Sequence, residues 1–136
     1  MGYSSPSVGY DGYVASNDVL VEDTTEYASF GGGGYTTKIT GKILTDLSSV
    51  STVRFKISLK HDQLTHTITI ILRIGGIVIW TQTHVATDAN YHVYTLDKLV
   101  TWRRGASISV KAQATANTGF NKDFQICGKV SPFELD

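Results

Sequence analysis

Residues 52–85 read TVRFKISLK, HDQL, THTITIILRI, GG and IVIWTQTHV, and apolar and polar side chains alternate through the three longer pieces. Successive side chains leave a β-strand on opposite faces, so this alternation is typical of strands with one buried face. Gly75-Gly76 is a two-residue link suited to a hairpin turn, and it predicts that Ile74 pairs with Ile77 and Thr67 with His84. In 52–60 the two predicted faces are Val53, Phe55, Ile57 and Leu59 inward, and Arg54, Lys56, Ser58 and Lys60 outward.

The rest of the chain repeats this rhythm between turn signals. Residues 24–30 are ambiguous, whereas 31–34 (GGGG), 46–51 and 102–105 are predicted to be loops or turns. The pattern predicts an all-β protein, a jelly-roll β-sandwich of about eight antiparallel strands. The further predicted strands are 18–22, 35–44, 91–99, 107–115 and 120–130. Their inward-facing residues include Ile108, Val110, Ala112, Ala114, Phe124 and Ile126.

Composition narrows the class of protein. The length of 136 residues suits one domain, with an extended amino-terminal arm expected at 1–13 and a β-sandwich domain at 14–136. Twelve basic and twelve acidic residues give a net charge of zero, whereas nucleic-acid-binding domains usually carry a basic excess. No apolar run approaches the roughly 20 residues that span a bilayer, and 1–13 lacks the regions of a signal peptide. We therefore expect neither nucleic acid nor a membrane as a partner.

The arm is rich in Gly, Ser and Tyr. It has little apolar area to offset the cost of ordering, which is about 1–2 kcal/mol for each backbone residue. Tyr3, Tyr10 and Tyr13 supply most of that area. Arms of this kind can lie against a neighbouring chain. We therefore expect subunit contacts through these three tyrosines, in a homo-oligomer.

No catalytic motif is visible in the sequence. No serine lies in a GxSxG elbow, and the glycine run at 31–34 lacks the Lys-Ser/Thr ending of a phosphate loop. Acidic residues fall mostly at predicted turns and termini, which does not favour the paired carboxylates of glycoside cleavage. The single cysteine, Cys127, is expected to be a small buried apolar residue. We expect a protein that is not an enzyme and needs no cofactor.

Histidines raise the question of a metal site. His84 and His92 flank the loop at 85–90 and could approach each other, whereas His66 is expected on the opposite face. A zinc site needs imidazoles that converge on one ion at about 2.0–2.1 Å. Alternation works against this convergence of His61, His66, His84 and His92, so no metal is predicted. Zinc, or calcium held by carboxylates and loop carbonyls, stays a minor alternative.

Aromatic side chains could form a shelf on which sugar rings stack. Trp80 and Tyr91 are candidates, although Trp80 is expected mainly in the core. Trp102 lies at a predicted turn next to two arginines, where cation–π packing is an equal interpretation. The predicted glycan platform consists of Trp102, Tyr94 and Arg103.

Five stretches carry a resemblance to a known family: 53–60, 72–81, 91–99, 102–112 and 123–127. In order and rhythm they resemble small jelly-roll domains of structural proteins from phages and archaeal viruses. The amino-terminal arm and the Arg103-Arg104 pair depart from that pattern. Sugar-binding jelly rolls share the same rhythm.

The resemblance implies a viral structural protein, a capsid, decoration or tail subunit that acts by self-assembly without catalysis. Its partners would be other copies of itself and other virion proteins, and its location the virion. The alternative is a carbohydrate- or receptor-binding jelly-roll module, with a glycan as partner and an extracellular or cell-surface location.

Overall fold

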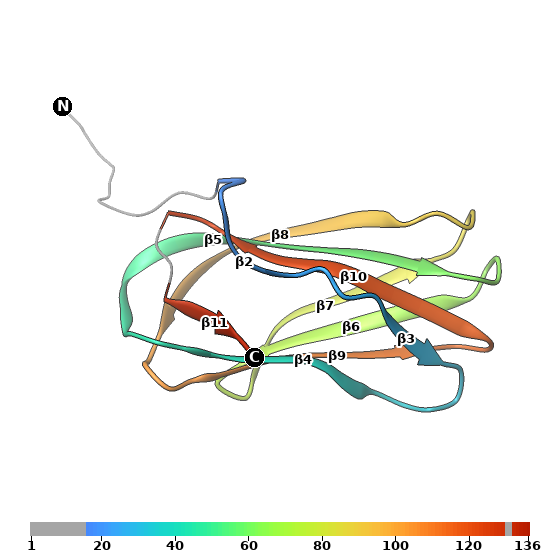
Figure 1. Cartoon of the computed structure of the whole chain (residues 1–136), viewed down its shortest axis with the longest axis horizontal. Helices are drawn as coiled ribbons and strands as arrows, with labels where there is room; N and C mark the ends of the chain where they lie inside the picture. Colours follow the sequence, from blue (N-terminus) through green and yellow to red (C-terminus); the bar gives the residue numbers. More distant parts are fainter. Residues whose placement is uncertain (1–15, 130–131) are drawn as a thin grey trace.

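Two antiparallel β-sheets lie face to face in the computed structural model, which describes residues 16–129 and 132–136 (Figure 1). The predicted all-β jelly-roll sandwich is confirmed, with ten strands in the described residues. The first sheet, named the β5 sheet, has the order β2 (Val19–Asp23), β10 (Thr118–Cys127), β5 (Leu47–His61) and β8 (His92–Trp102), and β3 (Tyr27–Phe30) also pairs with β10. The second, the β6 sheet, has the order β11 (Phe133–Leu135), β4 (Thr36–Ile43), β9 (Ser107–Ala114), β6 (Thr67–Ile74) and β7 (Ile77–Val85).

Two strands are longer than the sequence predicts. Residues 46–51, predicted as a polar turn, instead enter β5 at Leu47, and β8 continues to Trp102. Leu47 and Trp102 are partners, so each strand extends because the other offers a backbone to pair with. The ambiguous segment 24–30 contains β3, which pairs with the start of β10. The glycine run forms the predicted loop, with Gly32 and Gly34 at positive φ.

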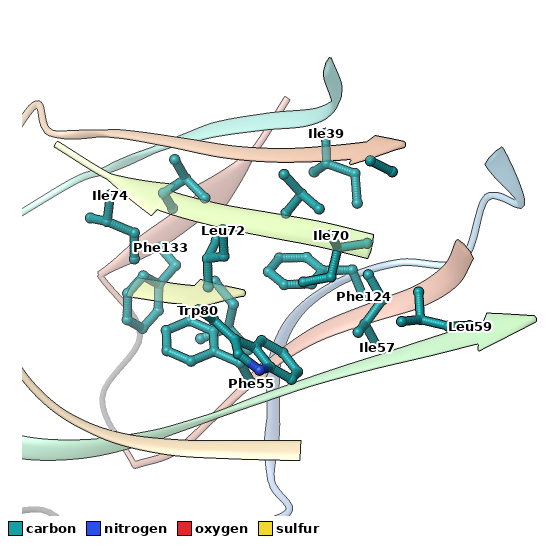
Figure 2. Packing of buried hydrophobic residues seen from close by; sticks show 14 of the residues in the cluster. Ile39, Phe55, Ile57, Leu59, Ile70, Leu72, Ile74, Trp80, Phe124 and Phe133 are labelled. Carbon is teal, nitrogen blue, oxygen red and sulfur yellow. The ribbon is translucent and has the colours of Figure 1, made fainter. Parts of the chain in front are cut away.

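The core lies between the two sheets. Phe55 and Ile57 of β5 point toward Ile70 and Leu72 of β6, and Figure 2 shows these side chains between the layers. Trp80 joins the same cluster, as expected. Close packing of this kind supplies the main stabilisation, because each fully buried large aliphatic or aromatic side chain contributes roughly 1.5–3 kcal/mol. All the predicted inward residues of 53–59, 108–114 and 124–126 are buried.

The β6–β7 hairpin shows a difference in register. Ile74 pairs with Ile77 as predicted, but His84 pairs with Ile68, and the predicted pairing of Thr67 with His84 is wrong. The cause is a β-bulge near the turn, which adds one residue to β7 and shifts every later pair. A shift of one residue changes the face on which side chains lie. His84 is consequently buried between the sheets.

Three sequence predictions concern other parts of the chain. Residues 1–13, with Tyr3, Tyr10 and Tyr13, lie outside the described residues. Cys127 is fully buried, as expected. Within 16–129 and 132–136, the structure contains no helix with the length and apolar character needed to cross a membrane.

The strand register can be tested with two isoleucines. Ile70 is 1% exposed and Ile77 is 68% exposed. Ile70→Ala should lower the free energy of unfolding by about 2–5 kcal/mol, because it leaves a cavity in the core. Ile77→Ala should change it by less than about 0.5 kcal/mol. Urea unfolding measures both, and similar small losses in the two variants would contradict this register.

Candidate functional site

The outer face of the β5 sheet carries the polar residues that alternate with the core residues of β5. Burial of one set of side chains directs the other set to the opposite face. Neighbouring strands add their own outward residues in rows across the sheet. The rows join Lys60 to Phe120, Ser58 to Lys122 and Val93, Lys56 to Gln125 and Thr95, and Arg54 to Asp97.

Strand β10 contains a β-bulge beside the middle of β5. Lys122 pairs with Ser58 and Gln125 with Lys56, so two residues of β10 face a single residue of β5 between these pairs. Asp123, inside the bulge, has a φ of 53°, in the left-handed region that non-glycine residues rarely adopt. Bulges redirect side chains and are frequent next to binding sites, as is backbone strain of this kind. The bulge places Asp123 on the outer face, directly after Lys122.

A hollow of about 230 Å³ opens beside the bulge, lined by Lys56, Ser58, Val93, Asp123 and Gln125. It is smaller than the roughly 300–1,000 Å³ pockets that hold drug-sized ligands, so it suits a group of about one ring. An ammonium, a hydroxyl, a carboxylate and an amide line it together. The hollow therefore offers several hydrogen-bond donors and acceptors to a small polar group.

Tyr91 lies at one end of this face. The ammonium nitrogens of Lys60 and Lys122 are 4.7 and 4.4 Å from the centroid of its ring, and Lys60 is also 5.1 Å from that of Phe120. The Tyr91 hydroxyl donates a hydrogen bond to the carboxylate of Glu26, in the link between β2 and β3. Burial and this hydrogen bond raise the pKa of Tyr91, so the phenol stays protonated. The ring is thus held across the sheet, with two cations beside it.

An ion pair closes the other end of the face. Arg54 donates from Nε and Nη2 to the two carboxylate oxygens of Asp97 at 2.8 and 3.0 Å, and from Nη1 to Asn17 at 2.9 Å. The hydrogen bonds that Arg54 donates to Asp97, together with the charge of Arg54, lower the pKa of Asp97. Next to the hollow, Gln125 Nε2 donates to Glu22 at 3.0 Å. Both ends of the face are therefore fixed by side-chain bonds.

The predicted glycan platform of Trp102, Tyr94 and Arg103 is not assembled. Tyr94 and Trp102 are eight residues apart on β8, which corresponds to roughly 26 Å. The Trp102 ring packs against Phe55 and Phe133, with centroids 6.2 and 5.7 Å apart, at the edge of the core. Tyr94 faces inward and bonds to a histidine, and Arg103 is exposed beyond the end of β8. Tyr91, the other aromatic candidate, is the one that lies on the site face.

The four histidines form two stacked pairs. The ring centroids of His61 and His66 are 5.7 Å apart, and those of His84 and His92 are 5.0 Å apart, which confirms the expected approach of the second pair. No group of three or more His, Cys, Asp or Glu side chains in residues 16–129 and 132–136 is arranged to hold a metal ion. In each stacked pair, the ring nitrogen atoms point away in the plane of their own ring, so they do not converge on one metal ion.

His84 is the most constrained of the four. Its Nδ1 lies 2.6 Å from the Tyr94 hydroxyl, and its Nε2 is buried without a hydrogen-bond partner among the described residues. His92 in turn bonds through Nε2 to Asp88 at 2.8 Å. Burial, followed by the charge of His92, lowers the pKa of His84, whereas Asp88 acts in the opposite direction. The folded protein therefore favours the neutral imidazole.

Sequence reasoning missed the residues that β10 contributes to the site. Residues 121–123 read NKD between Phe120 and Phe124, and this polar run breaks the alternation of the strand. Such a break is a sequence signal for a bulge. The neighbours of Tyr91 carry no comparable signal, because Lys60 and Lys122 come next to it only through strand pairing.

No protein-family model and no curated protein matches this chain. Solved structures similar in fold include the CBM22-1–GH10 modules of endo-1,4-β-D-xylanase 10B from Clostridium thermocellum, complexed with xylohexaose (13% identity, TM-score 0.45, 85% of this chain and 29% of that one). A carbohydrate-binding module of lichenase 5A from Cellvibrio mixtus, in complex with cellotriose, has 14% identity and a TM-score of 0.42 over 82% of this chain and 98% of that one.

A third is the CBM22-1 xylan-binding domain of a Paenibacillus barcinonensis protein (14% identity, TM-score 0.37, 84% of this chain and 96% of that one). This chain thus spans less than a third of the Clostridium chain. The second is named as a carbohydrate-binding module and the third as a xylan-binding domain. At such identities and TM-scores, the function of this chain has to be inferred from its own residues.

The lowered pKa of the buried His84 side chain predicts that the stability of the protein depends on pH. Its pKa is lower in the folded protein than the usual 6.5, so the unfolded chain binds the proton first as the pH falls. The free energy of unfolding should therefore decrease below a pH of about 6.5. Carboxylates with a lowered pKa, such as Asp97, add their loss only as the pH falls through about 3.8. Urea unfolding between pH values of about 7.5 and 5 measures the histidine contribution.

Two variants separate His84 from the other histidines. His84→Gln should reduce this loss of stability measurably, because glutamine has no group that titrates between these pH values. His66→Gln, in the other stacked pair, should leave it in place. A His84→Gln protein with the pH dependence of the wild type would show that another group is responsible.

Proposed function

We propose that this domain binds a carbohydrate on the outer face of the β5 sheet, with one sugar ring in the hollow beside the bulge. The observation that carries the proposal is the position of that hollow. Its lining combines Ser58, Asp123 and Gln125 with the apolar side of Val93, and Tyr91 lies at the end of the same face. A sugar ring presents hydroxyl groups at its edge and C–H groups on its faces, which is the chemistry that this lining complements.

Each lining group has a role in this proposal. The carboxylate of Asp123 accepts hydrogen bonds from sugar hydroxyls, and the Gln125 amide and Ser58 hydroxyl can donate or accept. Tyr91 offers an aromatic surface that Glu26 holds in place. The bulge holds the backbone of Asp123 at a φ of 53°, which directs this residue to the outer face.

The site supports binding rather than cleavage of the glycan. Glycoside hydrolysis generally uses two carboxyl groups on either side of the scissile bond. Asp123 is the single carboxylate among the residues that line the hollow. A non-catalytic binding module is the role that this arrangement favours, and we propose for it a location at a cell surface or outside the cell.

The proposal is tested by titrating the protein with a panel of neutral and acidic oligosaccharides in a calorimeter. Gln125→Ala should weaken binding about three- to tenfold, because one hydrogen bond contributes roughly 0.5–1.5 kcal/mol. Gln113→Ala is the matched control, since Gln113 is also half-buried and lies on β9 of the opposite sheet. Its affinity should equal that of the wild type.

Tyr91 provides a second pair of variants. Tyr91→Ala should weaken binding about tenfold, because the loss of contact with an aromatic ring is worth on the order of 1.5 kcal/mol. Tyr91→Phe keeps the ring and loses only the hydrogen bond to Glu26, so it should bind nearly as well as the wild type. If no oligosaccharide on the panel binds to the wild type, or if Gln113→Ala weakens binding as much as Gln125→Ala, this site is not the binding face.

Self-assembly, the role implied by the resemblance to virion proteins, is a second candidate. Ile77 and Val78 at the β6–β7 turn and Leu99 on β8 are 68%, 49% and 64% exposed. Strands β7 and β8 stand at the ends of the strand orders among the described residues. Open edges and exposed apolar side chains favour contacts between chains.

This candidate predicts a concentration-dependent oligomer in light scattering. Removal of residues 2–13, which takes away Tyr3, Tyr10 and Tyr13, should then shift the mass toward that of a single chain while the far-UV spectrum stays that of a β-protein. A wild-type protein that remains a single chain at all concentrations would argue against assembly and leave glycan binding as the sole candidate.

A further inference from the structure

Three lysines around the hollow have no acidic partner. Lys56 lines the hollow, and Lys60 and Lys122 lie beside Tyr91. Among the described side chains, none of the three has a carboxylate oxygen within the 4.0 Å of a salt bridge, in contrast to Lys42 and Lys129, which are paired at 3.4 and 2.9 Å. Lys38, Lys98 and Lys111 also have no salt bridge among the described side chains, so the distinguishing feature of Lys56, Lys60 and Lys122 is their shared position around the hollow and Tyr91.

The two ammonium groups beside Tyr91 also repel each other. Both lie within 5 Å of one ring centroid, so they are separated by less than about 10 Å, the screening length at 0.1 M salt. The negative face of the ring attracts both ammonium groups. An anionic group bound near both of them would be attracted by both charges.

The carboxylates near this position accept hydrogen bonds from neighbouring side chains or line the hollow. Glu26 accepts the hydrogen bond of the Tyr91 hydroxyl, and Glu22 accepts that of Gln125. Asp123 belongs to the lining of the hollow, where sugar hydroxyls would donate to it. The face thus has a cationic end at Tyr91 and a hydrogen-bonding end at Asp123 and Gln125.

We propose that the glycan bound here is acidic, a chain of uronic acid residues whose carboxylate lies near Lys60 and Lys122 while hydroxyls of the sugar occupy the hollow. This inference rests on the proposed function and adds the class of ligand. A singly charged carboxylate suits the site better than a densely sulfated sugar, because Asp123 contributes a negative charge nearby.

The test compares oligogalacturonate with its fully methyl-esterified form, which has the same sugar and no charge. The full-length protein should bind the acid at least tenfold more tightly than the ester, and the difference should shrink as NaCl is raised from about 0.05 to about 0.5 M. Lys60→Met and Lys122→Met should each weaken binding of the acid about fivefold to tenfold and weaken binding of the ester clearly less, so that the preference for the acid shrinks. Lys111→Met, a half-buried lysine on β9 of the opposite sheet, is the matched control and should have no effect.

The outcomes distinguish this inference from the proposal on which it rests. If acid and ester, or neutral oligosaccharides, bind equally well and binding depends on Gln125, the domain binds glycans but the preference for acidic ones is refuted. If dextran sulfate binds as tightly as oligogalacturonate and Gln125→Ala changes neither, the lysines form a general polyanion site and the assignment to uronic acids is refuted. If no glycan of any charge binds, both proposals fail together.

Discussion

The burial of one face of β5 determines what its other face presents. Phe55, Ile57 and Leu59 have no exposed surface, because they pack against β6 across the sandwich. Because successive side chains of a strand point to opposite faces, the residues between them lie on the outer face of the sheet. Lys56 and Lys60 are obliged to point outward, and the adjacent strands align their own outward residues in rows beside them. The core and the candidate site are thus two consequences of the same alternation.

Departures from this alternation give the fold its individual features. The bulge in β10 adds Asp123 to the outer face and creates the hollow, whereas the bulge in β7 turns His84 inward to meet Tyr94. Each bulge adds one residue to its strand. The added residue changes the face of the sheet on which the neighbouring side chain, Asp123 or His84, lies. In this sandwich, the two bulges determine on which face of a sheet Asp123 and His84 lie.

The sequence was sufficient to predict the sandwich and most of its core, because period-two alternation in 53–60 and 107–115 is a local property of the chain. The extension of β5 to Leu47 was not predictable, since a serine-rich segment forms a strand there only because β8 supplies a partner. The site was predicted least well. Tyr91 was among the aromatic candidates, but its neighbours Lys60 and Lys122 are each 31 residues away in the sequence and are brought to it by strand register. Trp102 lies beside two arginines in the sequence, a setting that is typical of a surface binding residue. In the structure its ring packs against Phe55 and Phe133 at the edge of the core.

The single cysteine, Cys127, can report on local opening of the β5 sheet. Cys127 is fully buried in β10, where it pairs with Val19 of β2 and Arg54 of β5, and burial raises the pKa of its thiol. A thiol-specific reagent requires both access and the thiolate form, so the native state is protected on both counts. The rate at which such a reagent labels the native protein therefore measures how often the structure around Cys127 opens, by separation of β10 from β2 or β5 or by global unfolding. Local opening at this edge can be followed by chemical labelling without altering a single residue.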